Sequence, residues 1–73
     1  MINWQGKPED RHLRGDSPIG TAWIRLDRKG KVTGLYLVQE HKTHKWVPHL
    51  DWQQDLEYCK VWMEELLRSV PGS

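Results

Sequence analysis

Hydrophobic and polar residues alternate along residues 21–26, a two-residue period that is typical of a β-strand with one buried face. We expect the strictly apolar face of this strand to lie in the core. It carries Ala22, Ile24 and Leu26. The opposite face carries Trp23 and Arg25 and is predicted to point away from the core.

Two further strands are predicted downstream of this one. Residues 27–31 read as a turn, and residues 32–39 form a second strand rich in β-branched and aromatic residues. Residues 45–47 can add a short third strand, which Pro48 should end because proline cannot donate a ladder hydrogen bond.

An amphipathic helix is the clearest prediction of the chain. Six residues at spacings of four and three share one helical stripe: Trp52, Leu56, Cys59, Met63, Leu66 and Val70. Asp51 is the expected N-cap, with Gln54 three positions on, and Pro71 should end the helix. The stripe is under three heptads long, so packing on the predicted sheet is favoured over a coiled coil.

The predicted fold class is α+β. We expect a small antiparallel meander of two or three strands, followed by one C-terminal amphipathic helix that packs on one face of the sheet. Residues 1–18 show no sustained period and are interpreted as an irregular N-terminal arm, so residues 19–73 form the single predicted domain.

One helix covers one face of a sheet, so the face that carries Trp23 is predicted to be a binding surface. Its neighbours on the second strand depend on the hairpin register, which could bring outward either Leu35 and Leu37 or Tyr36 and Val38. The predicted partner-binding residues are Trp23, Arg25, Leu35, Leu37 and Trp46. In the alternative arrangement the arm folds back, and Ile2 or Trp4 covers Trp23.

Charge is divided unevenly between the sheet and the helix. Residues 20–49 contain six Lys and Arg against two acidic residues, whereas residues 50–73 contain two against five. Basic residues around exposed aromatic side chains suit phosphate contact and base stacking, which makes a DNA- or RNA-binding module the alternative function. Its predicted contacts are Arg25, Arg28, Lys29, Lys31, Lys42 and Lys45.

A three-stranded sheet followed by one helix is similar in topology to the arm-binding domains of phage integrases. It is also similar to plant DNA-binding domains in which three strands precede one helix. This resemblance implies a sheet laid in the major groove of DNA. No sequence motif supports it, and the overall formal charge of the chain is only +1.

Metal binding and catalysis are not expected. His41, His44, His49 and Cys59 together contain zinc-ligand residue types, but only one close pair occurs, and Cys59 falls on the apolar stripe. No nucleophile, phosphate-loop or metalloprotease motif is present, and a chain of 73 residues has little room for a dry pocket. We therefore expect neither a metal nor a cofactor.

The remaining features predict a cytoplasmic protein that does not enter a membrane. The chain has a single cysteine, no apolar run near the roughly 20 residues needed to cross a bilayer, and no apolar secretion signal at its start. Its five Trp favour a non-enzymatic binding protein that docks on a larger protein or nucleoprotein. Small adaptors and inhibitors of this kind are common in phages and mobile elements, and homodimerisation is a further alternative.

Overall fold

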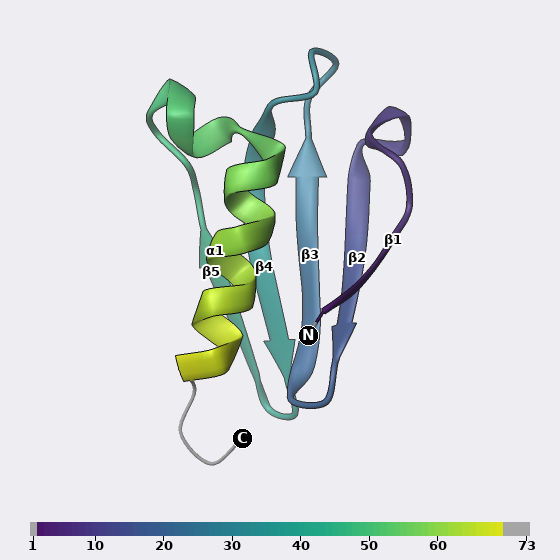
Figure 1. The fold of residues 1–73 in the computed structure, drawn as a ribbon, viewed down its shortest axis with the longest axis vertical. Helices are drawn as coiled ribbons and strands as arrows, with labels where there is room; N and C mark the ends of the chain where they lie inside the picture. Colours follow the sequence, from purple (N-terminus) through teal and green to yellow (C-terminus); the bar gives the residue numbers. More distant parts are fainter. Residues whose placement is uncertain (1, 70–73) are drawn as a thin grey trace.

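The computed structural model describes residues 2–69, which form a five-stranded antiparallel sheet with one helix across one face (Figure 1). The strands follow one another in sheet order as a meander: β1 (Asn3–Gln5), β2 (His12–Ser17), β3 (Gly20–Leu26), β4 (Val32–Gln39) and β5 (Lys42–Trp46). Short 3-10 helices lie at η1 (Pro8–Asp10) and η2 (Asp51–Gln54), and the α-helix α1 spans Leu56–Ser69. The α+β class is confirmed, but the prediction of two or three strands is wrong.

The two additional strands come from the segment that was expected to be an irregular arm. β2 lacks a clear apolar alternation because its two buried residues are Leu13 and Gly15, and glycine gives no hydrophobic signal. A Cβ added at Gly15 would clash with Ile2 and would lie 2.8 Å from the ring of Trp4. The side chains of Ile2 and Trp4 therefore pack directly on the backbone of Gly15, and any larger residue at position 15 would displace them.

The register of β3 on β4 decides which side chains form the core. Ile24 lies opposite Leu35 and Ala22 opposite Leu37, and all four residues are buried against α1. Leu35 and Leu37 were predicted to be partner-binding residues beside Trp23, but they lie on the other face of the sheet. Of the two registers that the sequence left open, the structure has the one that turns Tyr36 and Val38 outward.

The turn between β3 and β4 is organised by one carboxylate. Asp27 Oδ1 accepts hydrogen bonds from the backbone N–H groups of Lys29 and Lys31, at 2.8 and 2.9 Å. These bonds, the one from Lys31 foremost, hold the pKa of the Asp27 carboxyl below its ordinary value. Gly30 supplies the positive φ of 82° that the turn requires.

The helix begins later than the sequence pattern predicts. Asp51 opens η2 instead, and the cap of α1 is Asp55, whose Oδ2 accepts a hydrogen bond from the Tyr58 N–H at 3.0 Å. Because η2 interrupts the helical phase, Trp52 leaves the stripe and is 56% exposed. The buried positions of α1 are Cys59, Met63 and Leu67, with Leu56 and Leu66 half-buried beside them.

The last residue of the predicted stripe, Val70, and the predicted stop at Pro71 lie outside the described residues. Within the described residues, no helix has the length and apolar character needed to span a membrane.

The Met63→Ala substitution should lower the free energy of unfolding by about 2–5 kcal/mol, because Met63 is fully buried between the helix and the sheet. The matched control is Val61→Ala on the same helix, where the side chain is 54% exposed and little should change. Urea titration of both variants measures the difference. Equal stabilities would show that α1 does not pack on the sheet through this side chain.

The position of the helix cap gives a second prediction. Asp55→Ala should cost about 1 kcal/mol, because it removes the carboxylate that satisfies an N–H group in the first turn of α1. Asp51→Ala should lower the stability by less, because the Asp51 side chain is 95% exposed. Its ion pair with the Lys31 ammonium group, at 3.7 Å, is solvated and therefore contributes little. Thermal unfolding followed by circular dichroism would test this order, and the reverse order would place the cap at Asp51.

Candidate binding surfaces

A row of side chains, aligned across neighbouring strands, crosses the face of the sheet opposite α1. The strand registers align Arg14 on β2, Trp23 on β3, Tyr36 on β4 and Lys45 on β5. The Arg14 guanidinium carbon lies 5.6 Å from the ring centroid of Trp23, and the Lys45 Nζ lies 5.8 Å from that of Tyr36. Both distances are within the range of cation–π contacts. We call this side of the sheet, centred on the row and on its neighbour His12, the outer face.

The outer face is not covered by any element among residues 2–69. Trp4 pairs with Gly15 and packs on the core cluster, and Ile2 is buried in that cluster, so both lie on the helix side of the sheet. The alternative in which the N-terminal arm covers Trp23 is therefore wrong. Figure 1 shows the N-terminal segment over β2, while α1 lies over β4 and β5.

Trp23 and Tyr36 are only half-buried, and polar groups surround them. The His12 ring centroid lies 6.3 Å from that of Trp23, and Arg25 pairs with His12 on the neighbouring strand. The acidic residue in the same region is Asp16, whose Oδ1 lies 3.0 Å from the Arg14 Nε. The outer face thus has an aromatic centre with a mostly basic border.

The structure separates the six basic residues that were predicted to bind nucleic acid. Arg25 and Lys45 lie on the outer face, whereas Arg28, Lys29 and Lys31 belong to the β3–β4 turn at one end of the sheet. Lys42 pairs with Gln39 at the start of β5, two positions from His44, and therefore shares the helix side of the strand. Three outer-face residues were missed by the sequence reasoning: His12, Arg14 and Tyr36. The first two lie in the segment taken for an arm, and Tyr36 depended on the register.

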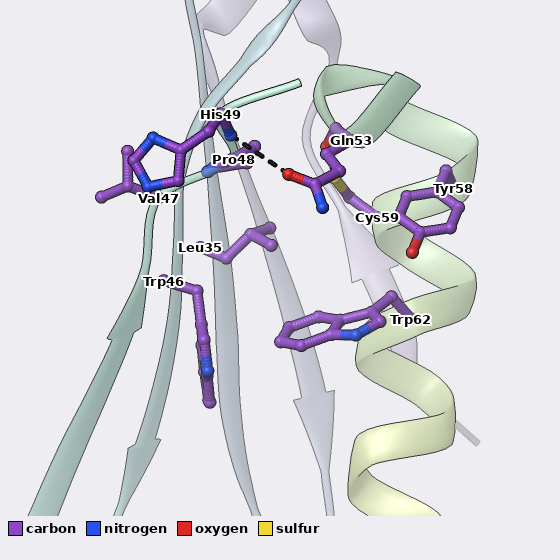
Figure 2. A pocket seen from close by; sticks show the side chains of 9 residues that line it. All are labelled: Leu35, Trp46, Val47, Pro48, His49, Gln53, Tyr58, Cys59 and Trp62. Carbon is purple, nitrogen blue, oxygen red and sulfur yellow. Dashed lines mark hydrogen bonds between the residues drawn. The ribbon is translucent and has the colours of Figure 1, made fainter. Parts of the chain in front are cut away.

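Trp46, predicted to be a partner-binding residue on the outer face, lies on the helix side instead. Its ring meets that of Trp62 edge to face, with centroids 5.1 Å apart, and stacks with His44 at 5.9 Å. Trp46 thereby forms the lower wall of a second candidate surface at the corner between β5 and α1 (Figure 2).

This corner contains a cavity of about 250 Å³. Figure 2 shows it between the chain that follows β5 and the side of α1, with Leu35 at its floor. Its lining comprises Leu35, Trp46, Val47, Pro48, His49, Gln53, Tyr58, Cys59 and Trp62.

Two polar side chains of the cavity lining, Gln53 and Cys59, form hydrogen bonds within the protein itself. The Gln53 side-chain oxygen accepts hydrogen bonds from the backbone N–H groups of His49 and Leu50, at 3.2 and 3.3 Å. The Cys59 thiol donates to the Gln53 carbonyl oxygen at 3.0 Å. The rest of the lining is mainly apolar, and Val47 and Tyr58 at the rim are 47% and 40% exposed.

No group of three or more His, Cys, Asp or Glu side chains in the described part of the chain is placed to hold a metal ion. His41 lies in the exposed β4–β5 turn, with its Nε2 3.9 Å from Glu40 Oε1, while His44 stacks on Trp46. Burial, with a smaller contribution from the Asp55 carboxylate, raises the pKa of the Cys59 thiol to about 11. This environment favours an unreactive thiol over a nucleophile.

Comparison with protein-family models, with curated proteins and with solved structures found no match to this chain.

The raised pKa of Cys59 predicts a specific loss of stability in alkali. The unfolded thiol ionises near its ordinary value of 9.0, whereas the folded thiol keeps its proton up to about pH 11. Its contribution to folding is therefore complete below pH 9 and is lost as the pH rises to about 11. The stability difference between the wild type and Cys59→Ala should narrow across this interval in urea titrations. A constant difference would mean that the thiol titrates alike in both states.

Proposed function

We propose that this protein is a small non-enzymatic binding module that docks on a larger protein or nucleoprotein through the outer face. The observation that carries the proposal is the pair of adjacent aromatic side chains, Trp23 and Tyr36, at the centre of a sheet face that no described element covers. Trp, Tyr and Arg are the residues in which interface binding energy concentrates.

The surroundings of this pair support a binding role over that of an ordinary solvated sheet face. Arg14 and Lys45 lie across the aromatic rings and can exchange these contacts for contacts with an acidic partner. Val38, on the same face, is 39% exposed and adds apolar area. An aromatic centre with a polar rim is the usual anatomy of a protein interface.

Nucleic acid is the second candidate partner, and one observation favours it. The outer face sets two aromatic rings on neighbouring strands with a cation beside each, at 5.6 and 5.8 Å. Single-stranded nucleic acid is commonly bound by such a combination, with bases stacked on rings and phosphates near basic side chains. The small number of basic residues on this face is the reason to rank it second.

The Trp23→Ala substitution shows whether Trp23 acts as an interface residue or as a core residue. We expect a stability loss well below the roughly 3–5 kcal/mol of a core Trp, but a loss of partner affinity above about 2 kcal/mol, or roughly thirtyfold. Trp52→Ala is the matched control, because Trp52 is 56% exposed and its ring lies against Tyr58 of α1, away from the outer face. Calorimetry measures the stability of each variant. Affinity capture from the native host identifies the partner, and titration with that partner measures the affinity. Severe unfolding of Trp23→Ala, or unchanged capture, would contradict the proposal.

The nature of the partner can be tested with a labelled oligothymidine and a labelled DNA duplex in a mobility-shift salt series. Phosphate-driven binding should weaken linearly with the logarithm of salt concentration, with a slope near the number of phosphates contacted. A salt-dependent shift that Trp23→Ala abolishes would favour the nucleic-acid candidate. The absence of a shift at low salt would leave the protein partner as the proposal.

A further inference from the structure

We propose that the free edge of β5 and the adjacent cavity form a docking site for an extended acidic peptide segment of a partner protein. The peptide would add a sixth strand to the sheet and place one bulky apolar side chain in the cavity. This site lies beside the outer face and does not depend on the function proposed for it.

The first observation is the unpaired edge of the sheet. β5 is the last strand in the sheet order and pairs only with β4 among the described strands. A two-residue turn joins the two strands, so the closing pair Gln39–Lys42 is hydrogen-bonded across the turn. Because hydrogen-bonding direction alternates along an antiparallel strand, Thr43 and Lys45 turn their N–H and C=O groups outward. These groups are available to an incoming strand.

The second observation is the position and size of the cavity. It begins at Trp46, where β5 ends, and its other wall is formed by Trp62 and Tyr58 of α1 (Figure 2). A strand added to β5 would point alternate side chains to the helix side, beside His44 and Trp46. The volume of about 250 Å³ is below the roughly 300–1,000 Å³ of typical small-molecule sites, and it suits a single large side chain.

The third observation is the charge of the edge, which selects the occupant. Within β5, Lys42 and Lys45 are basic and no residue is acidic. Pairing of β5 with a second copy of itself would bring like charges together, whereas an acidic strand would place opposite charges across the new ladder. The charge complementarity therefore favours an acidic peptide over a homodimer.

The test uses N-acetylated and C-amidated heptapeptides in which Glu and Thr surround a central Leu, Trp or Ala, with versions carrying Lys in place of Glu. Burial of a Leu or Trp side chain in the cavity should make these peptides bind at least about tenfold more tightly than the Ala peptide. The Lys peptides should bind most weakly. Fluorescence titration gives the affinities, and amide NMR shifts should move at Thr43, Lys45 and the cavity residues.

Thr43→Pro tests the edge directly. Proline removes an outward N–H group, which makes no bond to β4, so the sheet should remain while peptide affinity falls at least tenfold. Thr43→Val keeps the N–H group and is the matched control with unchanged affinity. Amide exchange in the wild type gives a second measurement, since peptide binding should slow exchange at Thr43 and Lys45 even where the proline variant is poorly folded.

Two outcomes would overturn the proposal. One is the absence of saturable binding for every acidic peptide at concentrations up to about 1 mM. The other is a wild-type dimer in sedimentation that Thr43→Pro dissociates, which would make a second copy the occupant. Trp23→Ala should leave peptide binding unchanged, so failure here is distinguishable from failure of the outer-face function.

Discussion

The pairing of β3 with β4 is the constraint on which the rest of the molecule depends. Leu26 pairs with Val32 and Arg25 with Gly34, so the intervening Thr33 forms an irregularity in the ladder. This extra residue allows Val32 to face the core although it is separated from Leu35 by an odd number of positions. Because side chains alternate between faces, a slip by one residue would exchange the core and the outer surface of the strand.

A single helix cannot cover five strands, and the N-terminal segment covers part of the same sheet face beside it. A helix of 14 residues is about 21 Å long and packs mainly over β4. The β2 side of the same face is covered by Ile2 and Trp4, which rest on Gly15. Within residues 2–69, the helix and the N-terminal segment therefore cover the same face of the sheet, and no element covers the opposite face with Trp23 and Tyr36. That asymmetry is the physical basis for the binding surface that we propose opposite α1.

The two candidate surfaces differ in what holds them in place. The outer face belongs to the middle of the sheet, where Trp23 and Tyr36 are set by strand pairing on both sides. The corner cavity lies between the end of β5 and the start of α1, and it is held by the Gln53 hydrogen bonds and by the contact between Trp46 and Trp62. The first surface is thus expected to be the more rigid, and the second has more room to adjust to an occupant.

The sequence by itself determined the elements with a strong local period: the strand around Trp23, the following strand and an amphipathic helix that buries Cys59 and Met63. It could not show that β2 is a strand, because a strand whose core positions include Gly15 carries little hydrophobic signal until its neighbours supply the apolar surface. The register, the position of the helix cap at Asp55 and the cavity were decided only in the tertiary structure. These three features depend on contacts between segments distant in sequence or on competition between local turns. The hydrophobic periodicity of the sequence does not predict such contacts or such competition.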